Sequence, residues 1–246
     1  MFEDLRNSQG ERLDSSLHTP SASAREMVII GHGVTANKDR AWAVALAEAL
    51  CAAGFAALRF SFSGNGESEG RFEDSCPTKE AEDLGAVIDR AVAAGYARAI
   101  YAGHSMGGAV GVLRASRDPR IAALISLAGM VETAAFARAK FGELAPGDCM
   151  WDKPECPLSQ TFLDDMRSIE SVASSAKQIQ VPWLLIHGRA DTVVPPEDSL
   201  AVARCTPAPV ELALVPGVDH VFSGVETALA ARVLRWIELL RFPETR

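Results

Sequence analysis

The sequence predicts an α/β fold in which a mostly parallel central sheet has helices on both faces. Short apolar runs alternate with longer segments of helical periodicity along most of the 246 residues. This alternation is the pattern of parallel strands joined by crossover helices. Because single α/β domains often exceed the usual ~150 residues, we predict one domain over residues 1–246 with an insertion at about 130–180.

The individual elements follow from the hydrophobic pattern. In the first long helical segment, Trp42, Leu46 and Leu50 recur every four residues and form one apolar face. The first ~25 residues, with a turn near residues 7–10, are predicted to form a hairpin. The predicted strands are 27–30, 55–62, 99–102, 121–127, 183–186 and 210–215. The predicted helices are 38–53, 78–94, 106–115 and 225–240.

The alternation breaks between about residues 130 and 180. Some fifty residues separate two strand signals there, although a crossover connection needs only a dozen or more. We interpret this segment as a small cap inserted over the carboxyl edge of the sheet, where ligands bind in such folds. The alternative is an ordinary helical crossover with an irregular loop. The cap contains four large aromatic residues: Phe136, Phe141, Trp151 and Phe162.

Charge and hydrophobic pattern predict neither nucleic-acid binding, nor a signal peptide, nor a membrane span. The net charge is −8 and no Lys/Arg cluster is present, so the sequence predicts no nucleic-acid binding. The start of the chain lacks the basic and apolar regions of a signal peptide. Residues 41–58 are nearly all apolar, but Gly54 and the many alanines fit a helix leading into a strand better than a membrane span.

The cysteines predict reduced thiols in a cytoplasmic protein. Five are present, an odd number, and none forms a CxxC pair. This distribution indicates neither a disulfide framework nor a zinc site. A disulfide between Cys149 and Cys156 is the one alternative that the sequence leaves open.

The strongest chemical signal is segment 103–108, which reads Gly-His-Ser-Met-Gly-Gly. It follows a predicted strand and precedes the apolar helix 106–115. A G-x-S-x-G turn in this context holds its serine in a strained conformation with the hydroxyl exposed. The helix N-terminus behind it favours developing negative charge. The segment therefore predicts Ser105 as a nucleophile; the alternative is a glycine-rich helix start with a solvent-facing serine.

A serine nucleophile needs a base and an acid. With a strand–turn–helix nucleophile, the acid and then the histidine follow along the chain, and only His220 lies beyond a plausible acid. Asp191 follows strand 183–186 and is predicted to lie at the same edge of the sheet as Ser105. Its carboxylate would keep the imidazole of His220 in the correct tautomer. Glu132 is the runner-up acid, and Asp191 as a simple turn-former is the other alternative. Three carboxylates are set aside because they face a helix N-terminus or point away from the histidine: Glu197, Asp198 and Asp219.

Two backbone N–H groups are expected to form the oxyanion hole. One is that of Met106, directly after the nucleophile, and the other is that of Val34 in the glycine-containing turn 31–35. The alternative is that those glycines are ordinary turn residues. His32, in the same turn, is interpreted as a residue that braces the loop by hydrogen bonding.

Five segments carry a family resemblance: HGVTANKD (32–39), RFSFSGNGESEG (59–70), GHSMGG (103–108), HGRADTVVP (187–195) and GVDH (217–220). Together they resemble the α/β-hydrolases. Within that group they are similar to bacterial cinnamoyl (feruloyl) esterases and to monoacylglycerol-lipase-like and serine aminopeptidase-type hydrolases. The resemblance runs from about residue 27 to the C-terminus, excluding the cap.

The resemblance implies the same site residues: Ser105, Asp191 and His220 as the triad, with Val34 and Met106 as oxyanion donors. Cinnamoyl esterases often have Phe and Gln at the positions of Val34 and Met106. These side-chain differences do not affect the backbone N–H donors, but they leave the identity of the substrate undetermined. The loop 64–68 resembles one that braces the floor of the active site.

We therefore expect a serine hydrolase that cleaves small-molecule carboxylic esters of small or aromatic acyl groups through an acyl-enzyme. The four cap aromatics are candidates to line the substrate pocket, unless they form the cap's own core. No nucleotide-binding glycine motif or metal constellation is present, so we expect no cofactor and no metal. The chain is expected to act without a membrane, and a homodimer remains one option. The alternatives are a peptidase, thioesterase or acylglycerol lipase with this triad, or a non-catalytic binding protein on the same fold.

Overall fold

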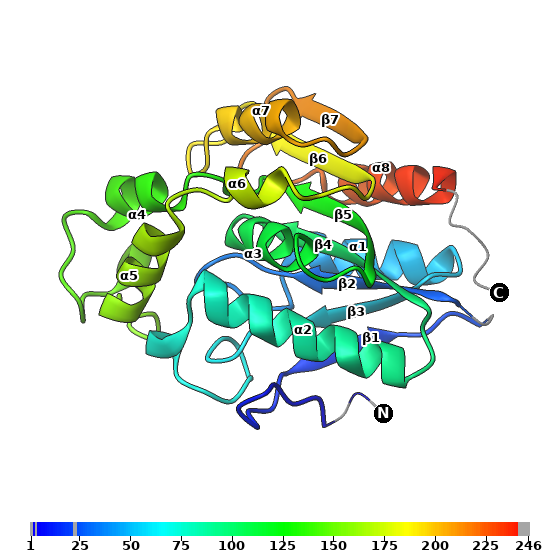
Figure 1. Cartoon of the computed structure of the whole chain (residues 1–246), viewed down its shortest axis with the longest axis horizontal. Helices are drawn as coiled ribbons and strands as arrows, with labels where there is room; N and C mark the ends of the chain where they lie inside the picture. Colours follow the sequence, from blue (N-terminus) through cyan, green and yellow to red (C-terminus); the bar gives the residue numbers. More distant parts are fainter. Residues whose placement is uncertain (1, 3, 22–23, 241–246) are drawn as a thin grey trace.

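A seven-stranded sheet forms the centre of the computed structural model, which describes residues 2, 4–21 and 24–240 (Figure 1). The strand order is β1-β3-β2-β4-β5-β6-β7, and every neighbouring pair is parallel except β1 with β3. The predicted mostly parallel sheet is confirmed. The strands are β1 (Ser15–His18), β2 (Glu26–Gly31), β3 (Ala56–Phe60), β4 (Arg98–His104), β5 (Ile121–Leu127), β6 (Trp183–Gly188) and β7 (Val210–Val215).

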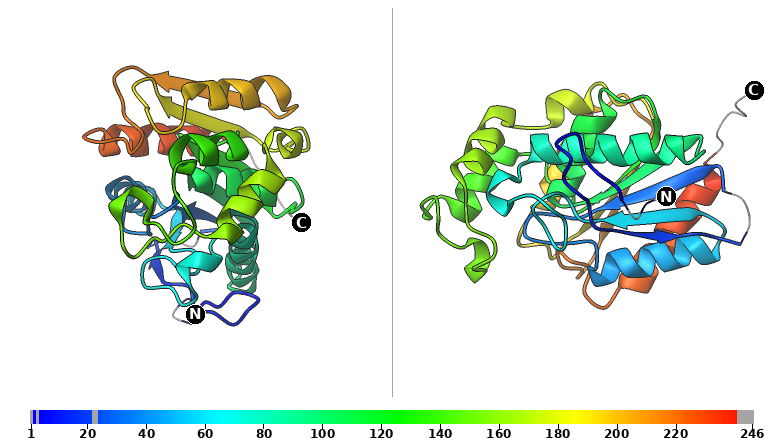
Figure 2. Two further views of the ribbon diagram at one scale, coloured as in Figure 1. Left: turned by 90° about the vertical axis from the view of Figure 1, so that its left-hand side faces the viewer. Right: turned by 90° about the horizontal axis from the view of Figure 1, so that it is seen from below.

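Helices cover both faces of the sheet, as Figure 2 shows from below. The central strands β3 and β6 are buried at every position and are mostly apolar because both of their faces are covered. One face packs against α1 and α8, and the other against α2 and α3. The helices are α1 (Ala41–Ala52), α2 (Pro77–Ala93), α3 (Met106–Ala115), α4 (Thr133–Phe141), α5 (Gln160–Ile169), α6 (Ala173–Ala176), α7 (Pro196–Cys205) and α8 (Glu226–Leu239).

The N-terminal segment forms the predicted hairpin and then an edge strand. Arg6 and Arg12 pair as an antiparallel bridge, and the N–H of Gly10 donates to the carbonyl of Asn7 at 3.0 Å. Strand β1 follows and was not predicted. Its sequence, SSLH, lacks an apolar run, because an edge strand with half-exposed side chains needs none.

The apolar stretch 41–58 is divided between helix α1 and strand β3. Gly54, with φ of 92°, makes the turn between them. Within the described part of the chain, no helix is long and apolar enough to cross a membrane.

The predicted cap is a helical insertion between β5 and β6. It contains α4, α5 and the short α6, with a 3₁₀ turn at Met150–Asp152. Figure 1 shows α4 and α5 beyond the end of the sheet at which β5 finishes. The disulfide alternative is wrong, since Cys149 and Cys156 are both free thiols, the first exposed and the second buried.

Candidate functional site

Ser105 occupies a strained turn between β4 and α3. Its φ and ψ are 54° and −119°, a region that costs a non-glycine residue about 1–3 kcal/mol. Neighbouring hydrogen bonds hold this conformation: the N–H of Ser105 donates to the carbonyl of Leu127 at 3.0 Å, and that of Met130 donates to the carbonyl of Ser105 at 3.0 Å. The turn is therefore fixed by the end of the neighbouring strand β5.

The flanking glycines are required by space. A Cβ on Gly103 would collide with the carbonyl oxygen of Gly107, and a Cβ on Gly107 would collide with that of His32. The G-x-S-x-G spacing thus lets strand, helix and the 31–35 turn approach closely around the serine.

Asp191 and His220 form a hydrogen-bonded pair. The His220 Nδ1–H donates to Asp191 Oδ2 at 2.7 Å. The other carboxylate oxygen, Oδ1, accepts from the N–H groups of Val193 at 2.8 Å and Val194 at 3.0 Å. Burial alone raises the pKa of Asp191, but hydrogen bonds from His187 and His220 outweigh it and hold that pKa well below its usual range. Asp191 is thus an ionised, oriented partner for His220.

His104, the residue before Ser105, connects the His220 loop to the turn. Its Nε2–H donates to the main-chain oxygen of His220 at 2.8 Å, and the two imidazole centroids are 4.7 Å apart. The His104 ring also lies near that of Trp42, with the two centroids 5.2 Å apart. This contact brings the His220 loop against the turn that carries Ser105. In the described residues, hydrogen bonds join Asp191 to His220 but not Ser105 to His220.

The turn expected to supply the second oxyanion donor lies directly against the nucleophile. A Cβ on Gly33 would be 2.8 Å from Ser105 Cβ and 3.3 Å from Ser105 Oγ. Neither the N–H of Val34 nor that of Met106 has an acceptor within the described part of the chain. Both N–H groups are therefore free to donate to a ligand.

His32 braces this turn, as its position in the sequence suggested. It is buried; its Nδ1–H donates to the carbonyl of Gly33 at 2.8 Å, and its Nε2 accepts from the N–H of Phe62 at 3.0 Å. Both ring nitrogens are used, so His32 ties the turn to the segment after β3.

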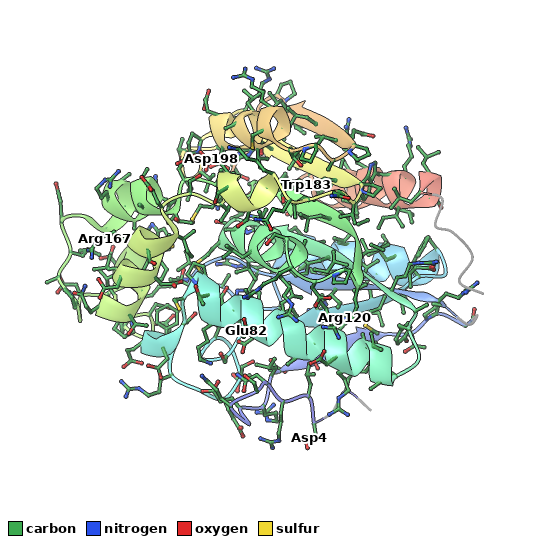
Figure 3. The ribbon with its side chains drawn as sticks, in the orientation of Figure 1. Asp4, Glu82, Arg120, Arg167, Trp183 and Asp198 are labelled. Carbon is green, nitrogen blue, oxygen red and sulfur yellow. The ribbon has the colours of Figure 1, made fainter. Side chains whose placement is uncertain are left out.

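The other carboxylates do not contact His220. Glu132 is exposed and accepts from Ser171 Oγ at 2.9 Å. Asp198 (Figure 3) and Glu197 lie in the first turn of α7, as expected. The Asp198 carboxylate, however, accepts from the N–H groups of Val131 and Glu132 at 2.7 and 3.2 Å, so it secures the start of the cap.

Asp219 turns away from His220, as predicted. Its Oδ1 accepts from the N–H of Ser223 at 2.9 Å. The 64–68 loop contacts the N-terminal segment: Ser68 Oγ donates to the carbonyl of Ser61 and accepts from the N–H of Asp14, both at 2.8 Å. The loop therefore joins the end of β3 to the segment before β1.

The aromatic residues of the cap pack on one another. The ring of Phe141 lies edge-on to those of Phe136, Trp151 and Phe162, with centroids 6.0, 4.8 and 6.0 Å away. Trp151 is 41% exposed and the other three are buried. Phe136 also lines a cavity of about 270 Å³ that includes Asp191 in its wall, and neither Ser105 nor His220 is among its lining residues. Phe136 thus connects the aromatic cluster of the cap to the wall of this cavity.

Among the described residues, no group of three or more His, Cys, Asp or Glu side chains is arranged to hold a metal ion. The reactive groups of the site are the serine hydroxyl, the imidazole and carboxylate pair, and the backbone donors. This set suits proton transfer and nucleophilic attack on a carbonyl carbon.

Two of the buried histidines, His32 and His104, predict a loss of stability in mild acid. Burial lowers the pKa of His32 to about 4 and, together with His220, that of His104 to about 3. An unfolded histidine titrates near ~6.5, so the unfolded chain gains protons below that pH before the folded chain does. The contribution of each neutral histidine to the free energy of unfolding is fully present above the unfolded-state pKa. It is lost as the pH falls from there toward the folded-state pKa. We expect each histidine to lower the free energy of unfolding by about 2 kcal/mol between pH 7 and 5.

Urea unfolding at pH 7, 6 and 5 measures this effect, and His32→Gln should remove about half of it. A free energy of unfolding that is constant over this range in the wild type would contradict the prediction.

The fold and this site are those of an α/β-hydrolase of the serine hydrolase class. Residues 22–146 and 154–224 match the family model described as serine aminopeptidase, S33. The chain belongs to this family.

A curated relative and two solved structures extend the comparison. The chain is 30% identical over 182 residues to the uncharacterized protein Rv2307c of Mycobacterium tuberculosis (strain ATCC 25618 / H37Rv). That match covers 74% of this chain and 59% of the relative, so the chain spans less than two thirds of the relative's length. A structure of Est1E from Butyrivibrio proteoclasticus with ferulic acid bound has a TM-score of 0.84 and 27% identity, covering 93% of this chain and 95% of that one. Monoacylglycerol lipase from Paleococcus ferrophilus, at TM-score 0.73, 19% identity and coverage of 92% and 98%, shares the fold.

Proposed function

We propose that the protein hydrolyses carboxylic esters of small or aromatic acyl groups through an acyl-enzyme on Ser105. The observation that carries this proposal is the Asp191–His220 hydrogen bond of 2.7 Å in a loop that packs, through His104, against the strained serine turn. A serine, an imidazole and an ionised carboxylate in this arrangement are the components of serine ester hydrolysis.

In the proposed cycle, His220 Nε2 takes the proton of Ser105 as Oγ attacks the acyl carbonyl. The N–H groups of Val34 and Met106 stabilise the oxyanion of the tetrahedral intermediate. His220 then protonates the departing alcohol and leaves an acyl group on Ser105. Water, deprotonated by His220, attacks this ester and releases the acid. Asp191 keeps the Nδ1–H tautomer throughout and stabilises the imidazolium.

One comparison supports an aromatic or small acyl group. The Est1E structure, with which this chain shares 27% identity, contains ferulic acid. Phe136 borders the cavity that has Asp191 in its wall. In this proposal Phe136 is the cap residue nearest the substrate. Phe141, Phe162 and Trp151 support the cap around it.

Lipase activity is an alternative function, and one observation favours it: the fold is shared with monoacylglycerol lipase from Paleococcus ferrophilus. A peptidase or thioesterase would use the same residues. Five free cysteines also support a reducing compartment, and we propose that the enzyme acts in the cytoplasm on a small-molecule ester.

Hydrolysis of p-nitrophenyl esters of increasing acyl length, followed by methyl hydroxycinnamates, tests the substrate class. We expect kcat/KM to be highest for acetate, butyrate and the hydroxycinnamates, and to fall at least about tenfold for dodecanoate, because a site that fits a small or aromatic acyl group excludes a long chain. A maximum at long chains would replace the esterase assignment with a lipase. Activity on thioesters or peptides alone would replace it with those classes.

A further inference from the structure

A second imidazole contacts the carboxylate of Asp191. His187, the penultimate residue of strand β6 before the Asp191 loop, is fully buried. Its Nε2 lies 3.1 Å from Asp191 Oδ2, the same oxygen that His220 contacts, and 3.0 Å from the carbonyl oxygen of Val194. No step of the proposed cycle uses His187.

The neighbours of His187 determine where its hydrogen lies. Both groups that face Nε2 are acceptors, so Nε2 carries a hydrogen and donates it. The opposite nitrogen, Nδ1, is 2.7 Å from Ser199 Oγ on helix α7. In the neutral ring the hydroxyl of Ser199 donates to Nδ1. Ser199, His187, Asp191 and His220 therefore form one continuous hydrogen-bonded chain.

The charge of Asp191 Oδ2 is consequently shared between two imidazole donors. A donor that binds the carboxylate stabilises its negative charge and lowers its affinity for the proton on the other partner. Because Oδ1 is already occupied by two backbone donors, His187 also leaves Asp191 one orientation, with Oδ2 toward His220.

We propose that His187, held by Ser199, is a positioning residue that orients Asp191 and tunes its basicity toward His220. The proposal rests on the proposed triad. The ionisable groups that interact with His187 are Asp191 on its own loop, His220 beyond that carboxylate, and Asp198 on helix α7.

Two amide substitutions at this position form a matched pair. The amide of His187→Gln reaches the place of Nε2 and can still donate to Asp191, whereas that of His187→Asn reaches only the place of Nδ1. We expect His187→Asn to lower kcat by about 10–100-fold with KM changed less than about threefold, since positioning of the base acts on the chemical step. His187→Gln should recover at least about tenfold of that loss.

The pH profile separates this role from a loss of packing. Without the donor, Asp191 Oδ2 carries more charge and stabilises the His220 imidazolium more strongly. The acid limb of kcat/KM should therefore move to higher pH, by about half a unit or more, in His187→Asn and remain near the wild-type position in His187→Gln. Rates are normalised to the fraction of protein that a serine-directed phosphonate labels, so unfolded molecules do not count.

Equal acid limbs in wild type, His187→Asn and His187→Gln would overturn the inference. Ser199→Ala provides a second test if neither His187 variant folds. This substitution removes the hydroxyl that donates to His187 Nδ1, and it should shift the acid limb in the same direction by a smaller amount. An unshifted acid limb in Ser199→Ala would also overturn the inference. The Ser105→Ala variant separates the two ideas. If it remains active, the proposed triad fails; if it is inactive while the limbs coincide, only the role of His187 fails.

Discussion

Ser105→Ala is expected to lower kcat for the best ester by roughly 10⁴-fold or more, because the proposed acyl-enzyme forms on the Ser105 hydroxyl. The fold should be unaffected. Alanine keeps the Cβ, so the turn retains the same backbone strain at φ 54°, and the hydrogen bonds that fix the turn involve only the main chain. We expect an unchanged unfolding midpoint, measured by circular dichroism, beside the loss of turnover.

The control is Ser116→Ala, at the far end of the same helix. Ser116 Oγ donates to the carbonyl of Leu113 at 3.0 Å, and the residue lies at the C-cap of α3. A serine-directed phosphonate should label wild type and Ser116→Ala and leave Ser105→Ala unlabelled. Turnover that persists in Ser105→Ala after active-site titration would assign the nucleophile elsewhere.

The sequence predicted the sheet and this serine turn well because both depend on local patterns. Parallel strands buried on both faces are apolar runs, and such runs predicted β2 to β7. The turn at Ser105 depends on Gly103 and Gly107, whose need for space is visible in the spacing alone. The pairing of Asp191 with His220 was predictable because each follows a strand, and parallel strands end at one edge of the sheet.

Contacts between distant segments could not be predicted in this way. His104 donates to the main chain of His220, 116 positions further on, and a histidine beside the nucleophile gives no sign of that acceptor. Asp198 was expected only at a helix N-terminus, yet it accepts from the N–H groups after β5. Strand β1 lacks an apolar run, since its pairing with β3 depends on backbone hydrogen bonds at the sheet edge.

Asp191→Asn is expected to lower kcat by about 10³–10⁴-fold, more than any substitution outside the nucleophile and base. All four partners of the carboxylate are N–H donors: His187 and His220 at Oδ2, and Val193 and Val194 at Oδ1. An amide must place its NH₂ group against one of these pairs. If it faces His220, the imidazole has to present a lone pair at Nδ1, which leaves Nε2 protonated and unable to accept the Ser105 proton.

If the NH₂ group instead faces the backbone donors, two N–H groups lose their acceptor in a buried site. This costs about 1–3 kcal/mol per unsatisfied group, so the variant should also unfold at a lower urea concentration than wild type. The wrong tautomer of His220 lowers the rate at every pH, because the wild-type Asp191 carboxylate is ionised throughout the working range. The kcat profile of Asp191→Asn should therefore run parallel to that of wild type, displaced downward, above its acid limb.

Glu132→Gln is the matched control, since Glu132 was the other candidate acid and its carboxylate bonds Ser171 rather than His220. We expect its kcat within about threefold of wild type, in line with an exposed hydrogen bond that the amide oxygen can replace. An inactive Glu132→Gln beside an active Asp191→Asn would move the acid to the end of β5. That outcome requires His220 to leave a 2.7 Å hydrogen bond and the main-chain contact with His104, which is why the geometry favours Asp191.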